Sequence, residues 1–374
     1  MKVWANVPVW GQSGWEVLCR ETVLALDRMG IYVSLKSKNE WNAELLDIEE
    51  EDASRLRRME KQTVTLESAD LHILHQVPDD EYLKSVYFLN SRAKKVCLSL
   101  FETNRCPINW ISKLNKMNEV WVYSNFNKEY WEVSGVKNIK VIPFGIDTRL
   151  FNASAKPALV KGRKKFMFIS NGDFTERKWF EGVIEAFVTE FTDEEDVCLL
   201  IKAHYGGFVR RHKEGVRKKI LETVRRFNKI NPPMVLFYGD KVATKDMPRF
   251  YTAGDCFVLT SRGEGLGVPY AEALACGVPV IATGWGGQTE FLTNENSYLI
   301  DYTLDVINDT EYIRKCLIAL NHSWATPNLT SLKSIMRLVY SFPEEAKKKA
   351  LIGMKEMEVK TWDNVAKWVI ANGR

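Results

Sequence analysis

The sequence predicts a protein of two parallel α/β domains, and three observations carry that prediction. Short apolar runs alternate with helical patterns along most of the 374 residues, which is typical of parallel sheets. The alternation is interrupted once, by the polar segment 152–164, and then starts again. A chain of this length is also too long for one ordinary hydrophobic core. We therefore expect one domain over 1–150 and a second over 156–341, followed by a helical tail at 342–374.

The first half of the chain predicts strands separated by helices. Each expected strand is a short apolar run bounded by polar, glycine or proline residues. The strands are expected at 2–10, 31–36, 69–76, 94–102, 119–124 and from 140. Helices are expected at 15–30, 107–118 and 125–135, with Pro107 at the first position of the second helix and Ser124 as the N-cap of the third.

The second half repeats this organisation. Its expected strands are 165–174, 196–204, 233–240, 256–261 and 279–283. A basic helical stretch at 210–230 places Val216, Ile220, Val224 and Phe227 on one face, as in an ordinary docked helix.

Composition excludes several classes of protein. The net charge of +4 is too small for a strong nucleic-acid field, so we expect no nucleic-acid partner. The seven cysteines are scattered, without a Cys-x-x-Cys pair, which favours reduced thiols and no metal site. No apolar run approaches the roughly 18 residues of a membrane span, and the N-terminus does not resemble a signal peptide. We expect a cytoplasmic protein.

The basic stretches 55–62 and 210–230 predict solvated surfaces, with peripheral contact to an anionic lipid surface as the alternative.

A glycine-rich turn between two glutamates, "GEGLGVPYAEALACGVPVIAT" at 263–283, is the first candidate site. The preceding strand should deliver Glu264 to the carboxyl edge of the sheet, where open α/β folds bind ligands. A helix that begins near Pro269 directs unpaired N–H groups at the turn and favours an anion. Glu272, expected in the first turn of that helix, suits paired sugar hydroxyls. Either glutamate alone also fits an ordinary helix start.

Two cations form a second candidate. Arg177 and Lys178 in "SNGDFTERKWFEGVIEAF" fall near a helix start, where cations oppose the helix dipole by roughly 0.3–1 kcal/mol each. A bound diphosphate would explain them, and solvated surface charge is the simpler reading.

Several segments together resemble the retaining glycosyltransferases of family 4, which have the GT-B fold. "EGLGVPYAEALACGVPVIAT" resembles the glutamate-x7-glutamate signature of that family, and "GDFTERKWFEGVIEAF" resembles its phosphate-binding strand and helix. Three further segments resemble the family in the same order, at 118–152, 246–267 and 283–292. The resemblance implies two Rossmann-like domains facing an interdomain cleft.

The resemblance also implies roles for single residues. Glu264 would contact donor-sugar hydroxyls, and Glu272 the ribose. Arg177 and Lys178 would hold the diphosphate. The backbone amides of the turn, at Gly265, Leu266 and Gly267, would assist them, and so would the backbone of Gly14 near the N-terminus.

Two positions depart from the family pattern. Gly172–Asp173 stands where the family often has glycine–arginine, and Glu102 stands where many members have a histidine. We include Glu102 among the catalytic candidates.

The implied function is transfer of a sugar from a nucleotide-diphosphate donor to a hydroxyl acceptor, with retention and without a metal or cofactor. The acceptor could be a glycan, a lipid-linked saccharide, a protein or a small molecule. The alternatives are a sugar-nucleotide epimerase or phosphorylase on a similar fold, and a non-catalytic partner subunit. A partner subunit would be expected to lose a glutamate or the basic pair, and all four residues are present.

The tail completes the prediction. Trp362, Val365, Ala366 and Val369 fall on one face of a helix. In GT-B enzymes the final helix returns to the N-terminal domain, so this helix is expected to contact residues below about 150, with Trp362 near the domain junction.

Overall fold

A computed structural model describes residues 1–37, 48–85, 90–204, 210–227, 230–308, 313 and 321–374. The chain divides into two compact units. The first contains Met1–Asp147, Thr310–His322 and Lys360–Arg374, and the second contains Thr148–Asp309 and Ser323–Val359.

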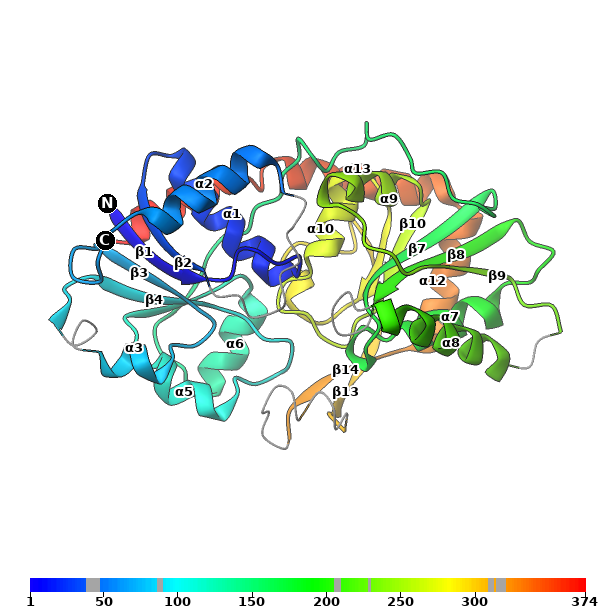
Figure 1. The fold of residues 1–374 in the computed structure, drawn as a ribbon. Coiled ribbons are helices and arrows are strands. Elements are labelled where there is room, and N and C mark those ends of the chain that lie inside the picture. Colours follow the sequence, from blue (N-terminus) through cyan, green and yellow to red (C-terminus); the bar gives the residue numbers. More distant parts are fainter. Residues whose placement is uncertain (38–47, 86–89, 205–209, 228–229, 309–312, 314–320) are drawn as a thin grey trace. The chain divides into compact units, whose positions relative to one another are not determined.

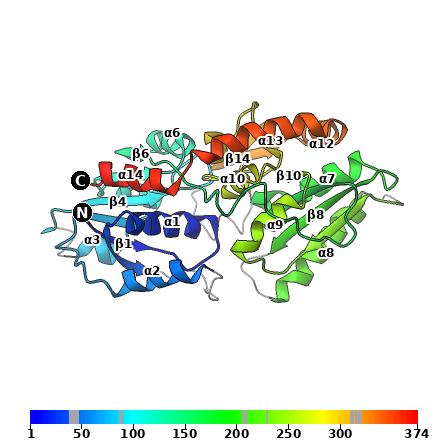
Figure 2. The ribbon, with the colours of Figure 1, turned by 90° about the horizontal axis from the view of Figure 1, so that it is seen from above.

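The first unit is built on a six-stranded parallel sheet with the order β2-β1-β3-β4-β5-β6. Its strands are β1 Lys2–Val7, β2 Tyr32–Ser37, β3 Leu71–His75, β4 Lys94–Ser99, β5 Glu119–Val122 and β6 Ile139–Val141. One face carries α1 Gly14–Arg28, α2 Glu50–Lys61 and α14 Trp362–Asn372, and the other carries α3 Asp80–Lys84, α5 Ile108–Leu114 and α6 Asn125–Val133 (Figures 1 and 2). These strands match those expected from the sequence.

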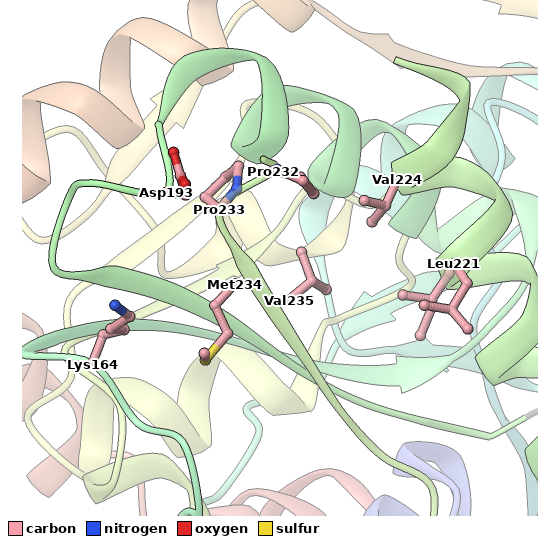
Figure 3. Close-up of a pocket in the computed structure, with 9 residues that line it drawn as sticks. Lys164, Asp193, Leu221, Val224, Pro232, Pro233, Met234 and Val235 are labelled. Atoms are coloured by element: carbon pink, nitrogen blue, oxygen red, sulfur yellow. The ribbon is translucent and has the colours of Figure 1, made fainter. Parts of the chain in front are cut away.

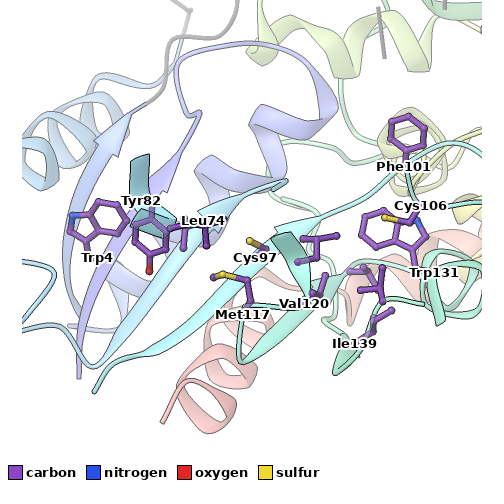
Figure 4. Close-up of a cluster of buried hydrophobic side chains, with 14 of the residues drawn as sticks. Trp4, Leu74, Tyr82, Cys97, Phe101, Cys106, Met117, Val120, Trp131 and Ile139 are labelled. Carbon is purple, nitrogen blue, oxygen red and sulfur yellow. The ribbon is translucent and has the colours of Figure 1, made fainter. Parts of the chain in front are cut away.

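A cluster of buried side chains fills the space between this sheet and the helices α3, α5 and α6 (Figure 4). Tyr82 of α3, Leu114 of α5 and Trp131 of α6 meet Leu74 and Val120 of the sheet in this cluster. The N-caps follow the local sequence: Ser124 accepts a hydrogen bond from Asn127 N, as expected. Pro107 lies one position earlier than expected, as the N-cap of α5.

The second unit has a six-stranded parallel sheet with the order β12-β11-β10-β7-β8-β9. Its strands are β7 Phe166–Asp173, β8 Val197–His204, β9 Met234–Tyr238, β10 Cys256–Leu259, β11 Val280–Thr283 and β12 Tyr298–Ile300. An antiparallel pair, β13 Tyr302–Val306 and β14 Ser323–Pro327, follows. The sequence did not predict β12, β13 or β14.

Helices cover both faces of the second sheet. On one face lie α7 Phe180–Glu190, α8 Arg210–Arg226 and α12 Leu329–Ser341, and on the other lie α9 Met247–Thr252, α10 Val268–Ala275 and α13 Pro343–Glu358 (Figure 1). The basic helix α8 packs on α7 and β8 with Val216 and Ile220 buried, which confirms its predicted docked face.

The basic residues of α2 also have partners within their unit. Arg55 Nη1 and Arg58 Nη2 lie 2.9 Å and 2.6 Å from the carboxylate of Asp27 on α1. Their charges therefore help to hold α2 against α1. Within the described residues, no helix is long and apolar enough to cross a membrane.

The segment 342–374 is divided between the two units, and its last helix contacts the first unit, as expected. Its first helix, α13, packs on α10 in the second unit. Gly353 permits this close packing, because a Cβ added at Gly353 would lie 2.6 Å from Leu274 Cδ2. Its last helix, α14, packs on α1 in the first unit, with the Trp368 ring edge-on to Trp121 at 5.0 Å. The chain changes units between Val359 and Lys360.

Candidate functional site

The glycine turn lies where β10 ends at the carboxyl edge of the second sheet. Gly267, with φ at +92°, is the N-cap of α10, and Pro269 lies in the first turn of this helix. The sequence predicts Glu272 in the first turn of this helix, and that prediction is wrong. Because α10 begins at Val268, Glu272 lies in its second turn. The start of α10 lies at this turn, so the turn stays a candidate anion site, although Pro269 has no N–H and Tyr270 N already donates to Gly267 O at 3.1 Å.

A second glycine loop supports the turn. Gly287, at the start of a 3-10 segment Gly287–Glu290, donates its backbone N–H to Glu264 O at 2.6 Å. A Cβ added at Gly287 would lie 2.0 Å from Gly265 O, and neighbouring Gly286 has φ at +118°. Only glycine lets these two loops approach so closely. Sequence reasoning did not assign Gly287 a role.

The structure brings three of the predicted residues together. Lys178 is 7% exposed and Glu264 is 6% exposed, and Lys178 Nζ pairs with Glu264 Oε1. Arg177 Nη1 lies 3.3 Å from Glu264 Oε2 and donates to Gly263 O at 2.7 Å. Burial alone would raise the pKa of Glu264, but Lys178 and Arg177 outweigh it and lower this pKa to about 2. Glu264 is therefore a carboxylate at neutral pH.

Arg177 and Lys178 end a 3-10 turn, Glu176–Lys178, that leads into α7. Trp179, with φ at +52°, separates this turn from the helix. The two cations and one carboxylate leave the cluster with one net positive charge beside the start of α10. That charge balance suits an anionic ligand.

Glu272 belongs to a second cluster, which sequence reasoning missed. Tyr251 Oη of α9 donates to Glu272 Oε2 at 2.6 Å, and Tyr251 is fully buried. Lys202 of β8 is 6% exposed and donates to Asn171 Oδ1 of β7 at 3.2 Å. Burial raises the pKa of Glu272 to about 7, while Tyr251 and Lys202 act in the opposite direction. A lysine within the apolar run "VCLLIKAH" was the available sequence signal.

Asp173, where the family often has arginine, carries a different contact. Its Oδ1 lies 3.3 Å from Nε2 of His204, which is the paired residue on β8. Burial lowers the pKa of His204, although Asp173 opposes this change. The lowered pKa favours the neutral imidazole, so the contact has little charge–charge attraction at neutral pH.

Gly14 and Glu102 belong to the first unit, past the carboxyl ends of β1 and β4. Gly14 is the first residue of α1, whose N-cap Ser13 forms a reciprocal capping box with Glu16. Glu102 precedes Thr103, whose Oγ1 lies 2.9 Å from His322 Nδ1. The other candidates, from Arg177 to Glu272, all lie in the second unit.

A separate pocket of about 360 Å³ lies between α8 and β9 (Figure 3). Pro233, Met234 and Val235 line it on the strand side, and Leu221 and Val224 on the helix side. It contains none of the candidate residues. No group of three His, Cys, Asp or Glu residues in the described part of the chain is arranged to hold a metal ion.

Comparison with known proteins identifies this region. Residues 163–319 match the family model described as "Glycosyl transferases group 1". The GDP-mannose-dependent monoacylated alpha-(1-6)-phosphatidylinositol monomannoside mannosyltransferase of Corynebacterium glutamicum is 28% identical over 176 residues, which are 43% of this chain and 42% of that protein. The alpha-monoglucosyldiacylglycerol synthase of Streptococcus pneumoniae is 30% identical over 153 residues, which are 39% and 32% of the two chains. The chain thus spans less than half the length of these two relatives.

Solved structures match the whole chain. HepE of Anabaena, solved in complex with UDP and glucose, has a TM-score of 0.65 at 15% identity, over 99% of this chain and 98% of that one. Sucrose-phosphate synthase of Thermosynechococcus elongatus has a TM-score of 0.68 at 16% identity, with the same coverage. At such identities the likeness is one of fold. Residues 163–319 are thus similar to the group 1 glycosyl transferases, and the chain has the GT-B fold.

Proposed function

We propose that this protein is a retaining glycosyltransferase that moves a sugar from a nucleotide-diphosphate donor to a hydroxyl acceptor, without a metal or other cofactor. The observation that carries the proposal is the pairing of Lys178 and Arg177 with Glu264 beside the start of α10. A net positive cluster, a helix N-terminus and a close-packed glycine turn are together suited to a diphosphate with a sugar attached.

Each residue has a part in this proposal. Lys178 and Arg177 neutralise the diphosphate, with the amides of Gly265 to Gly267. Glu264 is ionised and accepts hydrogen bonds from donor-sugar hydroxyls, and Glu272 accepts them from the ribose. Gly14 of the first unit is the remaining phosphate-binding candidate, and Glu102 of the same unit is the remaining catalytic candidate.

The bond changes require no protein nucleophile. The acceptor oxygen forms a bond to the anomeric carbon on the face from which the diphosphate leaves. The bond from that carbon to the phosphate oxygen breaks, and the acceptor proton passes to the diphosphate. The protein lowers the barrier by stabilising the charge that develops on the leaving phosphate.

The comparisons support a nucleotide donor. HepE was solved with UDP, and the Corynebacterium relative is named as GDP-mannose-dependent. The names of two relatives contain a glycosylated lipid, and the name of a third contains a sugar phosphate. A lipid-linked hydroxyl at a membrane surface is therefore one acceptor to include in a screen, beside soluble glycans. The remaining candidates are a sugar-nucleotide epimerase, which needs no acceptor, and a non-catalytic partner subunit.

The first test is a thermal-shift screen of UDP-, GDP- and ADP-sugars, followed by assays with and without acceptors. A ligand that binds the native state raises the melting temperature. A glycosylated product that forms only when an acceptor is present supports the transferase. An epimerised donor that forms without acceptor would show that the protein is an epimerase instead. Donor binding without any product would favour the partner subunit.

The two glutamates make the test more specific. Glu272→Gln should weaken binding of both the free nucleoside diphosphate and the sugar nucleotide, because both contain ribose. Glu264→Gln should weaken the sugar nucleotide more than the free diphosphate. Lys218→Met, an exposed change on α8, is the control. Equal losses for both ligands in both variants would contradict the division of roles.

A further inference from the structure

Arg262 connects three parts of the second unit, and the proposed reaction gives it no role. Its backbone N–H donates to Arg177 O at 2.7 Å, which ties it to the 3-10 turn that carries both cations. Its backbone C=O accepts a hydrogen bond from Ala325 N of β14 at 2.8 Å. Glu264 follows two residues later in the chain. Arg262 therefore lies where the basic turn, the segment that leads to Glu264 and β14 meet.

The side chain of Arg262 is held by β14 as well. Its Nη1 donates to Thr326 Oγ1 at 2.9 Å, and its guanidinium lies over the ring of Trp324, 5.6 Å from the centroid. Trp324 is 1% exposed, so the ring that faces the guanidinium is part of the protein interior. One backbone bond, one side-chain bond and one cation–π contact thus attach Arg262 to three successive residues of a single strand.

The ribbon of β13 and β14 also contacts the second loop of the site. Tyr302 of β13 has its ring 6.4 Å from the ring of Trp285, which directly precedes the loop of Gly286 and Gly287. Gly287 N in turn donates to Glu264 O. Both loops that form the turn around Glu264 therefore contact the same antiparallel ribbon.

We propose that Arg262 is a positioning residue that acts through Arg177: held by β14, it fixes the backbone of Arg177 so that the Arg177 guanidinium meets the diphosphate. The proposal rests on the proposed function for its ligand, a nucleoside diphosphate. Arg177 is held at two points, because its C=O accepts from Arg262 N and its Nη1 donates to Gly263 O at 2.7 Å. A shift of the segment 262–263 would therefore move both ends of Arg177, and guanidinium bonds to phosphate depend on the direction of their donors.

Two other roles would use the same residue. Arg262 could bind a phosphate directly as a third cation, or its contacts could serve stability alone. Thr326→Val separates the first role, because it removes the hydroxyl acceptor and leaves the charge of Arg262 in place. Coupling to Arg177 separates the second role, because a purely structural contact weakens binding by the same factor whether or not the Arg177 guanidinium is present.

The experiment measures the affinity for UDP and GDP by calorimetry, well below the melting temperature of each variant. Thr326→Val should lose roughly three- to tenfold in affinity, the range that one hydrogen bond contributes. Thr326→Ser keeps the hydroxyl and should bind like the wild type, and Lys218→Met on α8 is the surface control. In an Arg177→Met background, Thr326→Val should lose no more than about twofold further, because the residue through which it acts is already changed.

Three results would overturn the positioning role. One is a loss in Thr326→Val that is as large in the Arg177→Met background as in the wild type. Another is a loss in Arg262→Met without any loss in Thr326→Val, which would show direct phosphate binding. The third comes from hydrogen exchange measured by mass spectrometry without ligand. Peptides that cover 261–264 and 323–327 should exchange faster in Thr326→Val while β8 keeps its protection, and unchanged exchange in both contradicts the proposal.

The ligand-free measurement also separates this proposal from the proposed function. Failure of UDP and GDP to bind the wild type overturns the proposed function. The exchange of 261–264 in Thr326→Val still decides whether β14 holds Arg262 in place.

Discussion

At the scale of single residues, the cluster of Glu264, Lys178 and Arg177 has to satisfy two demands. It holds a carboxylate in a buried place, and it offers positive charge to a ligand. Removal of Lys178 should therefore affect stability as well as binding, because Glu264 would lose its closest partner.

The stability effect has a predictable pH dependence. The pKa of Glu264 is about 2 in the folded protein against an ordinary value of 4.5, so this carboxylate stabilises the fold above pH 4.5 and loses that effect as the pH falls toward 2. Lys178→Met should cost about 3–5 kcal/mol at pH 7, as for a broken buried pair. The cost should shrink below pH 4.5. Thermal or urea unfolding between pH 3.5 and pH 7 measures it.

A double variant provides the control for this interpretation. Lys178→Met combined with Glu264→Gln removes the buried charge that Lys178 leaves behind, so it should be more stable than Lys178→Met alone at pH 7. A cost of Lys178→Met that is the same at pH 4 and pH 7 would show that the lysine stabilises through packing and not through Glu264.

At the scale of elements, the site depends on two loops that approach through glycine. The loop that precedes α10 and the loop that follows β11 meet where Gly287 donates its N–H to Glu264 O. Gly287→Ala should separate the loops, because the new Cβ would lie 2.0 Å from a backbone oxygen. We expect a loss of donor binding together with a lower melting temperature, measured by calorimetry and thermal unfolding.

A matched glycine makes this prediction specific. Gly215 on α8 has no atom within 4 Å of an added Cβ, so Gly215→Ala should stabilise the helix by roughly 0.5–1 kcal/mol and leave binding unchanged. Normal donor binding by Gly287→Ala would mean that the close approach of the loops is not needed for the site.

Much of the fold at this scale could be predicted from the sequence. The long apolar strands of both sheets were recognisable because parallel strands buried on both faces read as continuous apolar runs. Strands β12 to β14 were not recognised, since β12 has three residues and β13 pairs with a strand that is distant in sequence. The same limit applies to the site. Lys178 and Glu264 lie 86 residues apart, and no local pattern shows that they pair.

At the scale of the whole molecule, the end of the chain serves both units. Helix α13 completes the second unit against α10, and α14 covers α1 in the first. The small residues of α13 and the aromatic residues of α14 explain this division. Ala346, Ala350 and Gly353 of α13 are buried in close helix packing. Trp362 of α14 packs on Gly145, where an added Cβ would lie 2.5 Å from the Trp362 ring.

Deletion of residues 360–374 should therefore affect the two units unequally. The deletion exposes the surface that Trp362, Val365 and Val369 cover, and each such side chain contributes about 1.5–3 kcal/mol when buried. The first unit should lose most of its stability, and the second unit, which keeps α13, should stay folded. Hydrogen exchange measured by mass spectrometry should show lost protection in α1 and β5 and retained protection in β7, β8 and β10.

Two point variants refine the deletion. Trp368→Ala removes the ring that meets Trp121 and should produce a weaker form of the same pattern. Lys367→Ala changes an exposed residue of the same helix and should have no such effect. Because every candidate residue for donor binding lies in the second unit except Gly14, the deleted protein should still bind a nucleoside diphosphate. Equal loss of protection in both units would show instead that α14 supports the chain as a single cooperative structure.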